Sequence, residues 1–197
     1  MENKLKIIKT LDENRKGLHI RELSRKINTG LPNIKRYLDI FEKKRIIKKE
    51  KKANLINITL TYNLEAFPDL KQIHLSSFLK LPKNIQIASN DFLTELEEKP
   101  LISLIFGSYA KGNYTKTSDL DLLLVFQKLR NEKQIEETAK RIGMRTNVKI
   151  NPIYISYSQF KRDFLNKNHN FSNEIRNKII IINGIEYYYE LLKEFIK

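Results

Sequence analysis

The architecture is most visible in two stretches of the 197-residue sequence, Leu101-Ile-Ser-Leu-Ile-Phe-Gly-Ser-Tyr-Ala-Lys-Gly112 and Ser118-Asp-Leu-Asp-Leu-Leu-Leu-Val-Phe126. Each contains an apolar run. The first run ends at Gly107-Ser108, which is typical of a buried strand that turns sharply at its end. Aspartate is depleted in strands, yet the second stretch holds Asp119 and Asp121 at positions i and i+2. Their side chains therefore leave one face of a strand about 6.5 Å apart.

This pair of carboxylates predicts a site for a hard cation. Two like charges on an interior strand need a compensating positive charge, and Mg²⁺ prefers oxygen ligands. The alternative is a solvated strand end with two ordinary acids. The sequence has no cysteine and only 3 scattered histidines, so carboxylates must hold any metal. A P-loop is excluded, because Asn113-Tyr114 follows Gly107-x4-Gly112 where that motif requires Lys-Ser/Thr.

Together the two stretches resemble the nucleotidyltransferase superfamily, whose pattern Gly-Ser-x-Ala-x-Gly-x5-Ser-Asp-x-Asp is matched at every fixed position. The resemblance implies an α/β domain with a mixed sheet flanked by helices, and ATP or another nucleoside triphosphate as substrate. It implies that Gly107 and Ser108 bind the triphosphate, with Ser118 and Lys111 as further nucleotide-binding residues. Lys111 is equally well explained as a surface lysine. The catalytic residues would be Asp119 and Asp121, which would hold one or two Mg²⁺ ions.

One part of the superfamily pattern is missing. Catalytic members usually supply a third carboxylate from a later strand, which we expect here at residues 147–155. Val148 and Ile150 share one face of that strand, so Lys149 and Asn151 occupy the positions that would offer the acid. An amide ligates weakly and cannot act as a base, so the expected base is absent. The alternative sources of a third acid are Asp163 and Glu174.

The N-terminal third carries most of the positive charge. The formal net charge is +14, and residues 1–66 hold 17 lysines and arginines against 8 acids. Such an excess favours association with nucleic acid, although a solvated lysine-rich surface has the same composition. Apolar residues at helical spacing predict three short helices, with breaks at residues 14–17 and 28–30. The third begins at Leu31-Pro32.

A β-hairpin is expected after the third helix. Residues 45–48 open a strand, residues 49–54 form a polar turn, and residues 56–63 alternate between apolar and polar side chains as a second strand. The order of helices and hairpin over residues 1–63 resembles the winged helix-turn-helix family and implies DNA binding. The side chains expected to contact DNA point outward from the third helix and the hairpin: Asn33, Lys35, Arg36, Lys43, Lys49, Lys51 and Lys52.

These patterns predict a two-domain α/β (α+β) protein. A winged helix-turn-helix would span residues 1–66, a helical connector 67–99, and a nucleotidyltransferase-like domain 100–197. The connector would hold helices at 70–79 and 85–96. The chain would be completed by helices from Ser158 and near Ser172, a strand at 179–182 and a last helix at 186–196. With these elements the whole chain resembles archaeal fusions of a winged helix to a minimal nucleotidyltransferase. Tyr187, Tyr188 and Tyr189 would either stack on a nucleotide or pack in the core.

Two functions fit these observations. The first is Mg²⁺-dependent transfer of a nucleoside monophosphate to a protein or small molecule, and the resemblance implies an antitoxin-like role with a toxin protein as acceptor. The second is a non-catalytic DNA-binding regulator with a degenerate, nucleotide-sensing domain. An RNA-extending polymerase fits less well, because we expect the chain to be too short to add a large RNA-holding domain. With neither a long apolar run nor a signal peptide, we expect a cytoplasmic protein without a membrane partner. A homodimer would be ordinary.

Overall fold

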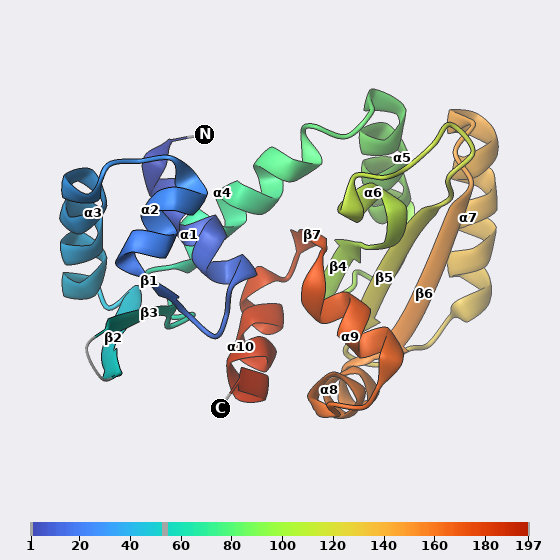
Figure 1. The fold of residues 1–197 in the computed structure, drawn as a ribbon. Coiled ribbons are helices and arrows are strands. Elements are labelled where there is room, and N and C mark those ends of the chain that lie inside the picture. The colour runs from blue at the N-terminus through green and yellow to red at the C-terminus, as the bar shows by residue number, and fades with distance from the viewer. Residues whose placement is uncertain (1, 53–54, 197) are drawn as a thin grey trace. The chain divides into compact units, whose positions relative to one another are not determined.

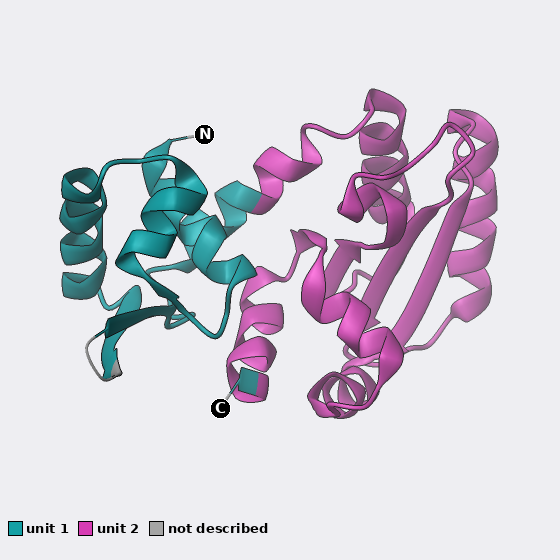
Figure 2. Cartoon of the chain, in the orientation of Figure 1, with its two compact units in different colours: residues 1–73, 196–197 teal, residues 74–195 magenta. Residues whose placement is uncertain are grey.

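The computed structural model describes residues 2–52 and 55–196, except for the side chain of Lys52. Contacts divide the chain into two compact units, residues 1–73 with 196–197 and residues 74–195 (Figures 1 and 2). The division falls within helix α4 (Phe67–Phe78). The domain boundaries expected from the sequence stay a prediction.

Within its described residues, unit 1 combines helices with a small antiparallel sheet. The elements are α1 (Asn3–Glu13), β1 (Leu18–His19), α2 (Ile20–Ile27), α3 (Leu31–Lys43), β2 (Ile47–Lys52) and β3 (Leu55–Leu60). The predicted helices are confirmed, and Pro32 lies in the first turn of α3. Asn28 ends α2 in the left-handed conformation, with a φ of 50°. The core of unit 1 is formed by apolar residues that recur at helical spacing, among them Leu11, Leu23, Ile34, Leu38 and Phe41.

The hairpin of unit 1 differs from the prediction. β2 continues to Lys52, through residues predicted as a polar turn, and pairs with β3 from Ile47–Leu60 to Lys52–Leu55. β1, which was not predicted, pairs with the other edge of β3 and gives the order β1-β3-β2. Backbone hydrogen bonds make the ladder, so lysine-rich β2 can remain a strand. A strand of two residues is too short to show an alternating pattern.

Unit 2 is built around a mixed four-stranded sheet. Its elements are α5 (Lys83–Glu95), β4 (Ile102–Ile105), α6 (Gly107–Lys111), β5 (Leu120–Phe126), α7 (Glu132–Thr146), β6 (Ile150–Ser156), α8 (Tyr157–Leu165), α9 (Asn170–Asn177), β7 (Ile180–Asn183) and α10 (Ile185–Ile196). The strand order is β6-β5-β4-β7. β5 runs parallel to β6, whereas β4 is antiparallel to β5 and β7. The predicted α/β fold class with a mixed sheet flanked by helices is confirmed.

Both faces of strand β5 are covered. α5 and α7 pack on the face that carries Leu122 and Leu124, in one core with Phe92 and Ile142. Leu123 and Val125, which alternate with them, are also fully buried. The open region is therefore the start of β5, where its two aspartates lie. Figure 1 shows α7 alongside β6 and β5.

The three consecutive tyrosines at the start of α10 differ in burial. Tyr188 and Tyr189 are each 1% exposed, so the packing alternative holds for both. Tyr187 is 47% exposed and touches Tyr157 edge to face.

Among the helices of the described residues, none combines the length and the hydropathy needed to cross a bilayer.

Candidate active site

The turn after β4 brings the backbone against Asp121. Gly107 has a φ of +67°, and a β-carbon at this position would collide with Oδ2 of Asp121. Glycine is therefore required here both by the backbone conformation and by the close approach. The sharp turn expected from the sequence is a short helix, α6, which ends at Gly112 with a φ of 78°. α6 thus starts directly beside the second aspartate.

The two aspartates lie at the start of β5. Asp119 immediately precedes the strand and Asp121 is its second residue. The amide of Phe106 donates to the carbonyl oxygen of Asp121 over 3.2 Å, which fixes β5 against the turn before α6. Both aspartates are partly exposed, and the side chain of Asp119 is 35% exposed.

The neighbouring strand offers an amine and an amide to these carboxylates. Asn151 lies opposite Asp121 in the parallel register, and its Nδ2 atom donates to Asp121 Oδ1 over 2.9 Å. Nζ of Lys149 lies 2.5 Å from Oδ2 of Asp119. The predicted faces of this strand are confirmed, because the side chains that alternate with these two are buried: Val148 and Ile150.

A third acid does not join the pair within the described part of the chain. No group of three or more histidine, cysteine, aspartate or glutamate residues that could hold a metal occurs there. Glu174 on α9 instead binds Lys111, with 2.5 Å between Oε1 and Nζ. Asp163 on α8 lies 3.4 Å from Nε of Arg162. Neither alternative source of a third carboxylate is grouped with the two aspartates.

The other residues predicted to bind nucleotide surround the same turn. Ser108 is the second residue of α6, and its carbonyl oxygen accepts from the amide of Gly112 over 2.9 Å. The Ser118 hydroxyl accepts from the amide of Thr115 over 2.8 Å, so it holds the loop that leads into Asp119. The ion pair of Lys111 with Glu174 is what the surface-lysine alternative expects.

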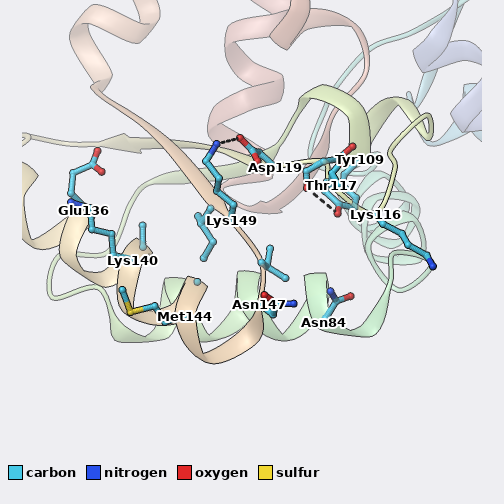
Figure 3. A pocket seen from close by; sticks show the side chains of 15 residues that line it. Asn84, Tyr109, Lys116, Thr117, Asp119, Glu136, Lys140, Met144, Asn147 and Lys149 are labelled. Atoms are coloured by element: carbon cyan, nitrogen blue, oxygen red, sulfur yellow. Dashed lines mark hydrogen bonds and ion pairs between the residues drawn. The ribbon is translucent and has the colours of Figure 1, made fainter.

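A cavity of about 660 Å³ opens beside Asp119 (Figure 3). It lies among α7, the segment before β6 and the loop before β5, and three lysines line it: Lys116, Lys140 and Lys149. Gly107 and Asp121 are not among its lining residues, so the cavity adjoins only one of the two carboxylates. These lysines stand against two acids, Asp119 and Glu136, and the net formal charge of +1 favours an anionic ligand.

Tyr109, which also lines the cavity, is fixed by its surroundings. Its ring stacks on that of Tyr114 with centroids 4.6 Å apart, and its hydroxyl donates to the carbonyl oxygen of Ser118 over 3.4 Å. Burial raises the pKa of Tyr109 above 10.0, and the nearby Tyr114 and Asp119 act in the same direction. The tyrosine therefore stays neutral at physiological pH, as a rigid wall of the cavity.

The residues predicted to contact DNA lie on unit 1. Those on α3 and Lys51 on β2 are exposed, and the Arg36 guanidinium lies 5.6 Å from the ring centre of Tyr37. Lys49 is less available, because its ammonium binds Asp39 at 3.1 Å and Glu42 at 2.7 Å. The side chain of Lys52 lies outside the described residues. The exposed residues of α3 are Asn33, Lys35, Arg36 and Lys43.

Comparison with known proteins places this site in a family. Residues 90–184 match the family described as nucleotidyltransferase domain. A protein of Methanocaldococcus jannaschii, assigned as a protein adenylyltransferase, is 31% identical over 88 residues, which are 43% of this chain and 88% of that protein. The chain therefore belongs to the nucleotidyltransferase domain family, as its motif predicted, and residues 90–184 form that domain.

A solved structure gives a weaker likeness. The crystal structure of an assigned nucleotidyltransferase from Sulfolobus solfataricus is 21% identical to this chain, with a TM-score of 0.28. The match covers 45% of this chain and 78% of that one. It adds nothing to the family assignment at this TM-score.

Proposed function

We propose that this chain transfers a nucleoside monophosphate, AMP from ATP in the first instance, to a hydroxyl group of a protein. The observation that carries the proposal is the convergence of Gly107, at the start of α6, with Asp121 and Asp119 at the start of the adjacent strand. The relative assigned as a protein adenylyltransferase supports ATP as donor and a protein as acceptor. A small molecule with a hydroxyl group is the other acceptor class that this chemistry admits.

The two carboxylates fit one magnesium ion that arrives with the nucleotide. Mg²⁺ in proteins is usually held by one or two carboxylates together with phosphate oxygens of the substrate. Asp119 and Asp121 supply such a pair, partly exposed and two positions apart. Asn151 already contacts Asp121, and its amide oxygen would add a neutral ligand. When bound, the ion neutralises negative charge on the triphosphate.

The chain's own groups would orient the reactants. Gly107 allows the backbone to approach the phosphates, and the amides of the first turn of α6 and the Ser108 hydroxyl are suited to donate to them. The acceptor hydroxyl oxygen attacks the α-phosphorus and gives up its proton to solvent, the bond from that phosphorus to the bridging oxygen breaks, and pyrophosphate leaves. Such a transfer depends mainly on positioning and on charge stabilisation, so it needs few protein groups.

Labelled ATP tests this function directly. The full chain is incubated with Mg²⁺, ATP labelled at the α-phosphate and an extract of the source cells. We expect label to move onto a protein with the unmodified chain and not with Asp121→Asn. The matched control is Asp91→Asn, which removes a surface carboxylate that binds Arg145 at 2.7 Å. Label transfer by Asp121→Asn, or no transfer by a chain that demonstrably binds ATP, would contradict the proposal.

The missing third acid predicts slow turnover. A general base typically contributes about 10²–10⁴-fold to rate, and neither Lys149 as an ammonium nor Asn151 accepts a proton. Because Asn151 lies opposite Asp121 in the register, Asn151→Asp restores a carboxylate at the site. We expect the initial rate of label transfer to rise by at least tenfold. An unchanged rate, with nucleotide binding intact, would show that no base is needed at this position.

We further propose that unit 1 is a winged helix-turn-helix that binds DNA. The support is the element order from α1 to β3 together with the exposed cationic and amide side chains of α3. Lys35 and Arg36 would contact the major groove or its phosphates, while Lys51 on the hairpin would contact the backbone. Lys49 is less suited to this role, because two carboxylates already hold it.

Salt dependence tests DNA binding. Affinity measured by fluorescence anisotropy should fall steeply with salt concentration, because each neutralised phosphate releases counterions. The double substitution Lys35→Gln/Arg36→Gln should reduce the slope of log K against log salt by about 2. Lys71→Gln, which removes an exposed lysine of α4, serves as the charge control. Absence of a complex at low salt would refute the proposal.

The second candidate function is a DNA-binding regulator that senses a nucleotide without turning it over. The pairing of Lys149 and Asn151 with the two aspartates favours it, since an ammonium and an amide stand where catalytic members carry an acid. Nucleotide binding without transfer of label, together with a nucleotide-dependent DNA affinity, would establish this function instead.

A further inference from the structure

The ion pair between Lys149 and Asp119 leads to an inference that rests on the proposed nucleotide chemistry. The lysine side chain is 77% exposed and that of the aspartate 35% exposed. Ion pairs with such exposure contribute little to stability, because water screens them. Lys149 can therefore leave Asp119 for another anion at small cost.

Charge balance limits the number of metal ions at the site. In a two-metal site with three carboxylates, the protein contributes a charge of −3, and two divalent ions leave a total of +1. Here Asp119, Asp121 and the Lys149 ammonium sum to −1. One divalent ion then gives the same total of +1, whereas two ions would give +3 and repel each other more strongly.

We propose that Lys149 takes the place of a second metal ion, so that the site binds one divalent ion per nucleotide. On binding, the Lys149 ammonium exchanges Asp119 for a phosphate oxygen of the nucleotide. Lysine suits this role, because it carries a compact charge on a flexible stem. Figure 3 shows Lys149 extended to Asp119 at the cavity, within reach of a ligand that enters there. Asn151 fits the same arrangement, because an amide adds no charge that would recruit a second ion.

The proposal predicts opposite effects of one substitution. Lys149→Gln removes the cation that competes for Asp119, so the nucleotide-free chain should bind Mn²⁺ several-fold more tightly. The same change removes a charge-assisted phosphate contact, so binding of α,β-methylene-ATP with Mn²⁺ should weaken roughly tenfold. A lysine that served only the fold would not shift the two affinities in opposite directions.

Electron paramagnetic resonance of Mn²⁺ tests the metal count independently of turnover. With α,β-methylene-ATP, the unmodified full chain should give the spectrum of an isolated Mn²⁺ ion. The double variant Lys149→Gln/Asn151→Asp should give the coupled spectrum of two ions. Lys128→Gln, which removes an exposed lysine just beyond the other end of β5, should behave like the unmodified chain. Lys149→Arg keeps the charge and should retain one ion.

Each contrary result has a distinct meaning. A coupled two-ion spectrum from the unmodified chain overturns the role of Lys149 and leaves the proposed function standing. Equal nucleotide affinities of the unmodified chain and Lys149→Gln, with both folded by circular dichroism, also overturn it. Failure of the unmodified chain to bind the nucleotide with Mn²⁺ overturns the proposed function and this inference together.

Discussion

Gly107 and Gly112 share a left-handed backbone but differ in their surroundings. A β-carbon on Gly107 would meet the Asp121 carboxylate, whereas one on Gly112 would meet nothing within 4 Å. Gly107→Ala should lower the free energy of unfolding by about 1–3 kcal/mol for the backbone alone, and displacement of Asp121 should abolish nucleotide binding. Gly112→Ala should lower the free energy of unfolding through the backbone conformation only and should leave nucleotide binding unchanged. Urea unfolding and analogue binding separate the two effects, and equal nucleotide affinity of both variants would contradict the assignment of Asp121.

For single residues, the sequence predicted the face of a strand on which a side chain lies better than it predicted the residue that the side chain contacts. Alternation along residues 147–155 placed Lys149 and Asn151 together on one side, and both indeed contact the aspartates. The partner of each could not be read from the sequence, because the contacts join residues 30 positions apart and depend on the register of β5 with β6. Glu174 shows the same limit, since its pairing with Lys111 depends on where α9 packs.

Among the elements, the largest omission from the sequence predictions is α7. Ile135, Ala139 and Ile142 recur at helical spacing and are buried, and the Asn131 side chain caps the helix by accepting from the amide of Gln134. The helical spacing is visible in the sequence and locates one side of the cavity, to which α7 contributes Glu136, Ala139, Lys140, Gly143 and Met144. The true length of β2 was less accessible, because the residues after buried Ile47 are all charged and show no alternation of apolar and polar side chains, so that pairing with β3 defines the strand.

The contact between α5 and α7 predicts a dependence of stability on pH. Glu95 on α5 lies 2.8 Å from Arg145 and 3.0 Å from Arg141, both on α7. Hydrogen bonds from Arg145 and then Arg141 lower the pKa of Glu95 below 4.5. The resulting stabilisation is present above pH 4.5 and is lost as the pH falls through the lowered pKa. Thermal unfolding should therefore separate the unmodified chain from Glu95→Gln at pH 6, and the difference should shrink as the pH is lowered further below 4.5, with exposed Glu97→Gln as control. A difference that did not change with pH would assign the effect to packing.

For the whole molecule, the two proposed functions differ in whether the units communicate. The chain forms two compact units, and the core under the aspartates consists of unit 2 residues. Suppose that the chain is a transferase whose unit 1 only localises it on DNA. The DNA affinity with nucleotide bound should then lie within about fivefold of the DNA affinity without nucleotide, and this factor is below the usual range of allosteric coupling. A regulator that senses nucleotide requires a larger coupling, and linkage then demands that DNA change nucleotide affinity by the same factor. DNA titrations with and without α,β-methylene-ATP and Mg²⁺ measure one side of this cycle, and nucleotide titrations with and without DNA measure the other. We expect both factors to lie near unity; two equal factors above tenfold would make sensing, rather than transfer, the role of the nucleotidyltransferase domain.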